Sequence, residues 1–185
     1  KAELEARKAV ANEIKKGFAK AGIKADIDGD TGEVLLDFGQ HYFEVNSANL
    51  KSEMKAVLQK AMPIYSKSLF GNPKISGKIS SVEVIGFASP TYQNRFIDPK
   101  SNKPEDIEAL KYNMDLSYKR ANSIFQYVLQ EKDLNFQHKT DLLPLMKVSG
   151  RSFLETLGNQ SRTTASTAAE FCKINDCKKA QRVII

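Results

Sequence analysis

The feature that most constrains the fold of this chain is the alternation of short apolar runs with longer segments of helical periodicity. Residues 80–87 (SSVEVIGF) are typical of a buried strand, and residues 145–153 (LMKVSGRSF) are expected to form another strand. Between them, residues 112–130 repeat their apolar positions at the spacing of a helix. A strand, a helix and a second strand in succession favour an α/β or α+β sandwich in which helices pack on a mixed sheet.

The remaining segments extend this pattern in both directions. Residues 3–20 carry a thin apolar stripe at helical spacing, and Gly22 is the expected end of that helix. Residues 23–38 (IKADIDGDTGEVLLDF) predict a β-hairpin around a Gly-Asp turn. The other expected elements are strands at 41–45 and 180–185, helices at 48–70 (capped by Ser47) and 162–171, a loop at 71–78, and a long polar insertion at 88–110.

Length and composition fit one domain with an appended helix. The chain has 185 residues, of which 41% are hydrophobic, enough for a substantial core. We expect residues 1–22 to be a linker helix and residues 23–185 to form the domain. The net charge of +6 is spread over mixed-charge segments. It therefore favours acidic partners in general without selecting one of them.

The sequence has neither a signal-peptide pattern nor a run close to the ~20 apolar residues of a membrane-spanning helix. Its first residue is Lys1 rather than a methionine. We therefore expect the chain to be an excerpt, with any targeting or membrane segment upstream.

The helix expected at 112–130 carries the most informative polar residues. Asn113 is the expected N-cap, and Arg120 lies two turns later, so both side chains point nearly the same way along the border of the buried face. Together with the free N–H groups of the first turn, they suit a carboxylate ligand. The spacing leaves a surface Arg120 paired with a glutamate as an alternative. The expected core face consists of Met114, Tyr118, Ala121, Phe125 and Val128.

The other reactive residues do not form a pattern typical of an enzyme. The two histidines, His41 and His138, lie in unrelated contexts, and there is no nucleophile elbow or carboxylate pair flanking a histidine. We therefore expect no catalytic residue, no metal and no cofactor. Cys172 and Cys177, in FCKINDC, are either a local disulfide, the favoured interpretation, or two reduced thiols.

Four motifs, in order, resemble those of the OmpA/MotB-type peptidoglycan-binding domains. Residues 112–130 (YNMDLSYKRANSIFQYVLQ) resemble the family's N-x-x-LS-x-x-RA-x-x-V-x-x-YL helix. Residues 42–58 (YFEVNSANLKSEMKAVL), 82–89 (VEVIGFAS) and 178–185 (KKAQRVII) stand where the family has F-x-x-x-S-A-x-L, I-x-I-x-G-H-T-D and N-R-R-V-E-I. The resemblance covers about residues 33–185. It implies an OmpA-like β-α-β-α-β sandwich with long loop insertions and a groove for the diaminopimelate of cell-wall stem peptides.

The resemblance also implies a ligand site. Arg120 matches the helix arginine that binds the diaminopimelate carboxylate, and Ser89 replaces the aspartate that takes the ligand ammonium. The positions that match the family's ligand-binding residues are Arg120, Asn113, Ser89, Ala88, Phe87 and Arg182. Ala88 stands in place of a threonine, Phe87 in place of a histidine, and Gln181 in place of the arginine before Arg182. Some members of the family have a cysteine pair before the last strand, which supports a disulfide between Cys172 and Cys177.

The function implied by the resemblance is that of a non-catalytic periplasmic domain that anchors a membrane protein to the cell wall. The charged helix and hairpin before the motifs are most similar to those of stator-type (MotB-like) members, which are tethered to the inner membrane by one helix. The implied partners are the peptidoglycan stem peptide, a second copy of the chain, and a MotA-like subunit reached through a membrane segment upstream of Lys1. No nucleic-acid partner is expected.

Several alternatives stay open at this level. The motifs do not distinguish a flagellar stator from the MotB-like subunit of the Zorya anti-phage system or from a general wall tether. The fold is also compatible with a protein-interaction or dimerisation module that binds peptidoglycan weakly or has lost that binding.

Overall fold

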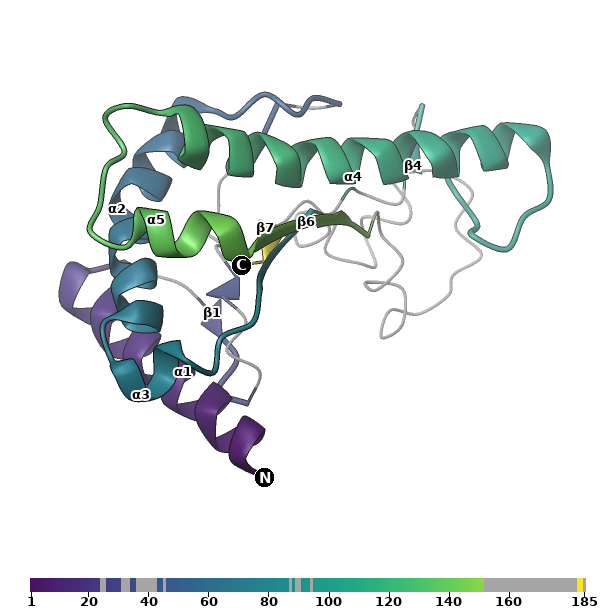
Figure 1. Ribbon diagram of the computed structural model, residues 1–185. Coiled ribbons are helices and arrows are strands. Elements are labelled where there is room, and N and C mark those ends of the chain that lie inside the picture. Colours follow the sequence, from purple (N-terminus) through teal and green to yellow (C-terminus); the bar gives the residue numbers. More distant parts are fainter. Residues whose placement is uncertain are drawn as a thin grey trace.

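The computed structural model describes residues 1–23, 26–30, 34–35, 43–44, 46–86, 88, 91–93, 95–151 and 183–184. Within these residues the chain has the predicted α+β architecture, in which helices pack against a small mixed sheet (Figure 1).

The sheet consists, within the described residues, of β1 (Asp26–Ile27), β2 (Val34–Leu35), β3 (Val82–Gly86), β6 (Met146–Gly150) and β7 (Val183–Ile184). Their order is β1-β2-β7-β3-β6. β3 and β6 run parallel, whereas β7 is antiparallel to both of its neighbours, β2 and β3. A parallel pair needs a long crossover connection between its strands, and a helix supplies it here.

The long helices are α1 (Ala2–Ala21), α2 (Ser52–Phe70) and α4 (Pro104–Gln130). α4 is the crossover between β3 and β6 and packs on both strands, while α1 packs on α2 (Figure 1). None of the helices among the described residues is long and apolar enough to cross a membrane. The common core of these helices and strands includes Ile14, Phe18, Leu58, Val84 and Ile124.

Several local predictions are confirmed. The first helix ends at Gly22, which has a φ of 68° and therefore adopts the left-handed conformation that favours glycine. In the segment predicted as a hairpin, β1 and β2 pair antiparallel, with Ile27 opposite Val34. The apolar runs at 80–87 and 145–153 contain β3 and β6.

The segment before α2 differs from the prediction. In the described part of the expected strand at 41–45, Phe43 forms only an isolated antiparallel bridge with Leu50. The helix begins at Ser52, with Lys51 at the N-cap position, so Ser47 is not its cap. The Ser47 hydroxyl instead accepts a hydrogen bond of 3.0 Å from the N–H of Asn49, a local turn that competes with helix formation.

Two segments predicted as loops contain regular structure. The short helix α3 (Pro73–Ser76) lies within 71–78, where the Asn72 side chain accepts a 3.0 Å hydrogen bond from the N–H of Lys74. The polar insertion at 88–110 contains a hairpin of β4 (Thr91–Tyr92) and β5 (Arg95–Phe96), followed by the first turns of α4. After α4, α5 (Lys139–Leu142) and the 3-10 helix η1 (Leu143–Leu145) lead into β6.

Two glycines allow α4 to lie directly on the sheet. Gly86 and Gly150 are partners in the parallel register of β3 and β6. A Cβ atom at Gly86 would overlap the carbonyl oxygen of Ser117, and one at Gly150 would lie 2.5 Å from the backbone nitrogen of Tyr118. Both neighbours belong to the helix backbone, so only glycine permits this separation of helix and sheet.

Candidate carboxylate-binding site on helix α4

Helix α4 begins at Pro104, well before Asn113, so the prediction that Asn113 is the N-cap is wrong. Pro104 occupies the first helical position, and Glu105 and Asp106 lie in the first turn, where acidic side chains are favourable. Asn113 and Arg120 are therefore interior residues of the helix. The free N–H groups of the first turn do not lie beside them and cannot complete a carboxylate site there.

The buried face of α4 is also rotated relative to the predicted core face. Ala121 and Val128 are buried as predicted, but Tyr118 is 46% exposed and Phe125 is only partly buried. Met114 is likewise only partly buried. The buried residues of the helix are Asp106, Ala109, Asn113, Leu116, Ser117, Arg120, Ala121, Ile124 and Val128. Asn113 and Arg120 thus lie inside the buried face, not along its border.

Arg120 is held against the segment that precedes α2. Its Nε donates a 3.0 Å hydrogen bond to the carbonyl of Ser47, and its guanidinium lies 5.3 Å from the centre of the Phe43 ring. The side chain is only 3% exposed, so the alternative of a surface arginine is wrong. Burial lowers the pKa of Arg120 to about 10, while Tyr112 nearby raises it, so the guanidinium stays charged at neutral pH. In such surroundings a charge interacts with an anion more strongly than it does in water.

Asn113 connects α4 to the segment that follows β3. Its Nδ2 donates a 3.3 Å hydrogen bond to the carbonyl of Thr91, the first residue of β4. Ala88, two residues after the end of β3, is fully packed at 1% exposed. The structure therefore brings Asn113 close to the segment after β3. The resemblance implies that this segment binds the ammonium group of the ligand.

Two tyrosines that the sequence patterns did not point to belong to the same region. The Tyr112 hydroxyl donates a 3.4 Å hydrogen bond to the carbonyl of Asn46, and its ring lies 5.1 Å from that of Tyr92 at an angle of 58°. Asn46 has a φ of 55°, a left-handed turn that asparagine tolerates better than most residues. The position of Tyr112, directly before Asn113, is the only feature of the sequence that could have pointed to this residue.

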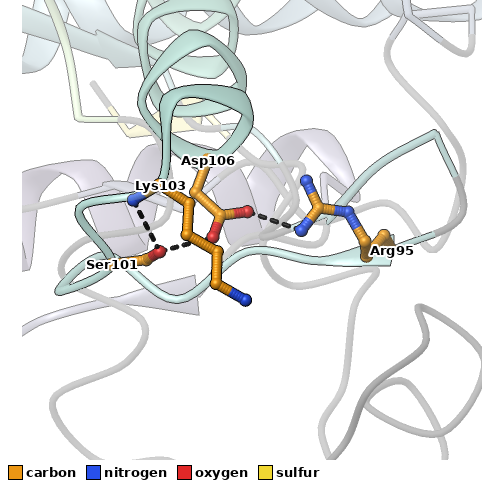
Figure 2. Close-up of polar contacts among 4 residues, drawn as sticks. All are labelled: Arg95, Ser101, Lys103 and Asp106. Atoms are coloured by element: carbon orange, nitrogen blue, oxygen red, sulfur yellow. Dashed lines mark hydrogen bonds and ion pairs between the residues drawn. The ribbon is translucent and has the colours of Figure 1, made fainter.

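A polar cluster fixes the start of α4 (Figure 2). Asp106, which is 7% exposed, accepts hydrogen bonds from Nη1 of Arg95 at 2.6 Å and from the Ser101 hydroxyl at 2.5 Å. The backbone N–H of Lys103 donates to Ser101 Oγ at 3.3 Å. The Ser101 hydrogen bond, with the help of Arg95 and against the effect of burial, keeps the pKa of Asp106 below its usual value. The cluster therefore fastens the β4–β5 hairpin to the helix.

The acids in the first turn of α4 lie too far from Arg120 to take the role of the aspartate that the resemblance expects where this chain has Ser89. Glu105 and Asp106 precede Arg120 by 15 and 14 residues. At 1.5 Å per residue, they are separated from it by about 21 Å along the helix axis. The carboxylate and the ammonium of an amino-acid group are bonded to the same carbon, so one such group cannot reach both Arg120 and these acids.

Among the described side chains, no group of three or more His, Cys, Asp and Glu residues could hold a metal ion. Nδ1 of His138 lies 3.1 Å from a carboxylate oxygen of Asp141, and its ring lies 6.1 Å from the ring of Phe70. His138 therefore has local partners in and beside α5.

Some of the predicted site residues lie outside the described residues. They are Phe87, Ser89, Arg182, Cys172 and Cys177, as well as His41. Their roles, and the disulfide between the two cysteines, stay predictions.

The fold and the site together define an α+β domain with a buried, charged arginine on its crossover helix. In comparisons with known proteins, neither a protein-family model nor a curated protein matches the chain.

Proposed function

We propose that this chain is a non-catalytic peptidoglycan-binding domain of the OmpA/MotB type, which anchors a membrane protein to the cell wall. Its ligand is the diaminopimelate of stem peptides. The observation that carries the proposal is the environment of Arg120. A buried guanidinium on the crossover helix contacts Ser47 and Phe43, which belong to a different one of the four motifs.

Three of the four motifs meet around α4 although they are far apart in the sequence. The segment with Phe43 and Ser47 contacts Arg120, and Gly86 at the end of β3 lies against Ser117. The elements β2, α2, β3, α4 and β6 also follow the strand-helix-strand-helix-strand order that the resemblance implies. Both observations support the assignment to the OmpA/MotB type.

Replacing Arg120 with methionine tests the proposal. Methionine preserves much of the side-chain volume and removes the charge, so the domain should still fold. A charge-assisted hydrogen bond contributes about 1.5–3 kcal/mol, so the Arg120→Met variant should bind at least about tenfold more weakly. The measurement is retention of the 185-residue chain on insoluble peptidoglycan.

The matched control is Lys119→Met, which removes one positive charge from the neighbouring, exposed position on the same helix. It should bind like the unchanged chain. Circular dichroism of both variants checks that they are folded. Equal retention of the unchanged chain and of folded Arg120→Met would remove Arg120 from the site and refute the proposal.

The second candidate function is a protein-interaction module with weak or lost peptidoglycan binding, and the observation in its favour is Ser89. A serine hydroxyl accepts a hydrogen bond but has no charge to offset a ligand ammonium. Leaving that ammonium unpaired costs on the order of 1–3 kcal/mol. We therefore expect Ser89→Asp to bind a diaminopimelate-containing muropeptide about fivefold or more tightly than the unchanged chain, by isothermal titration. No gain in affinity would argue against an empty ammonium site beside Arg120.

The proposal extends to the setting of the domain. In this proposal the chain lies in the periplasm, and a further segment of the protein tethers it to the inner membrane. Its partners are a second copy of the chain and a MotA-like subunit. The stator-like order of a charged helix and a hairpin before the motifs supports this part of the proposal.

A further inference from the structure

The side chains of Tyr112 and Arg120 end at the same backbone turn. Tyr112 donates to the carbonyl of Asn46 and Arg120 to the carbonyl of Ser47. The Cα atoms of consecutive residues are about 3.8 Å apart. The two donors therefore bind adjacent carbonyls of one turn, although their own residues are separated by about 12 Å along the helix. This arrangement also explains why Tyr112 raises the pKa of Arg120, against the effect of burial.

The two donors differ in how accessible they are. Arg120 is 3% exposed, whereas Tyr112 is 37% exposed. Tyr112 is thus the residue of the two that is more accessible to a ligand arriving from solvent. Its present hydrogen bond is 3.4 Å long, while O–H groups bind carboxylates at about 2.5–2.7 Å. Exchanging the carbonyl of Asn46 for a carboxylate would therefore strengthen the hydrogen bond.

The ring of Tyr112 is held in place by the β4–β5 hairpin. The ring of Tyr92 lies 5.1 Å away in a tilted arrangement that is favourable for aromatic pairs. The hairpin is fastened to α4 on both sides of this pair, through Asn113 and Thr91 and through Asp106 and Arg95. The Tyr112 hydroxyl is thereby oriented before a ligand arrives.

We propose that the Tyr112 hydroxyl is a second hydrogen-bond donor to the ligand carboxylate, beside Arg120, and that Tyr92 is the positioning residue that orients it. This inference rests on the proposed function, because it takes the carboxylate of diaminopimelate as the group bound at Arg120. It adds a residue outside the set that the motif resemblance assigns to the ligand.

The test removes the hydroxyl group from the protein and, separately, the carboxylate charge from the ligand. Tyr112→Phe loses only the hydroxyl and preserves the ring that packs on Tyr92. Its affinity is measured by titration for two muropeptides, one with a free diaminopimelate carboxylate and one with that carboxylate converted to an amide. We expect about tenfold weaker binding of the acid and little change for the amide. Tyr118→Phe is the matched control on the same helix, because Tyr118 is also exposed, and it should bind both ligands like the unchanged chain.

The role of Tyr92 is tested with the same two muropeptides. The quantity compared is the affinity for the acid divided by the affinity for the amide. Tyr92→Ala should lower this ratio, and Tyr92→Phe, which preserves the ring, should restore it. An unchanged acid affinity in Tyr112→Phe, or an equal loss for both ligands, would overturn the inference while leaving the proposed function standing. If the unchanged chain binds neither muropeptide, both proposals are wrong.

Discussion

Replacing Gly86 with alanine is expected to destabilise the fold by about 3 kcal/mol or more, because it forces helix α4 away from the sheet. The added Cβ would overlap the carbonyl oxygen of Ser117 and lie 3.1 Å from the backbone nitrogen of Ala121. A flexible side chain could turn aside, but the backbone of a helix that spans β3 and β6 must shift as a unit. Urea unfolding followed by circular dichroism gives the free energy of unfolding.

Gly150→Ala provides an independent repeat, because its Cβ would lie 2.8 Å from the Cα of Tyr118. Gly77→Ala is the matched control. Gly77 has a φ of −67°, and a Cβ there would meet nothing closer than 4.0 Å. This control should be as stable as the unchanged chain, or up to about 1 kcal/mol more stable, because alanine restricts the unfolded chain. A Gly86→Ala variant as stable as Gly77→Ala would contradict the close packing of α4 on the sheet.

Replacing Asp106 with asparagine is expected to lower the free energy of unfolding by about 2 kcal/mol at pH 7. The carboxylate accepts two short hydrogen bonds, from Arg95 and Ser101, and hydrogen bonds to charged groups contribute about 1.5–3 kcal/mol each. The expected loss is smaller than the sum for two such hydrogen bonds because the Arg95 side chain is 40% exposed and can be hydrated once its partner is gone.

The control for Asp106→Asn is Asp115→Asn, on the same helix. Asp115 pairs with Lys119 at 2.9 Å, but both side chains are well exposed, so little change in stability is expected. Equal stability of the two variants would contradict a stabilising role for the cluster in Figure 2.

The Asp106 cluster also has a defined pH dependence. The pKa of Asp106 is lower in the folded chain than its usual value. Its contribution to stability is therefore complete above the ordinary aspartate pKa of about 3.9, and is lost as the pH falls through the lower folded-state value. The difference in unfolding free energy between the unchanged chain and Asp106→Asn should persist from pH 7 down to about pH 5 and shrink below about pH 4. A difference that stays constant into that acidic range would show that the carboxylate charge is not the cause.

Elements with a strong local signal could be predicted from the sequence. The first helix ends at Gly22 because glycine adopts the left-handed conformation there without strain. The segments at 80–87 and 145–153 contain β3 and β6 because β-branched residues such as Val82, Val84 and Val148 suit a strand that is covered by a helix. The start of α4 was missed because Pro104 looked like part of a loop, although proline at the first helical position is favourable.

Part of the candidate site could also be predicted. The spacing of Asn113 and Arg120 placed both side chains on one side of a helix, and both lie on the buried face. The burial of the two side chains was predicted wrongly. A position along the border of the buried face was expected, whereas Arg120 is nearly as buried as the core residues.

By itself, the sequence determined the periodicity of the longer segments, and therefore a fold that mixes helices with strands and the order of α1, the β1–β2 hairpin, α2, β3, α4 and β6. Periodicity alone does not determine which face of α4 is buried, because the helix has apolar residues on the predicted face as well as on the face that is buried in the structure. Contacts with distant parts of the chain decided that question. Gly86 and Gly150 offer room only for the helix backbone at Ser117 and Tyr118, and this contact turns Asn113 and Arg120 inward and Tyr118 outward.

The tertiary structure alone also brought Tyr112 to Asn46, 66 residues away in the sequence, and so placed the partly exposed Tyr112 at the same turn as the buried Arg120. No local pattern contains that information. The energy of such a contact depends on the positions of two segments that meet only after the chain has folded around its core.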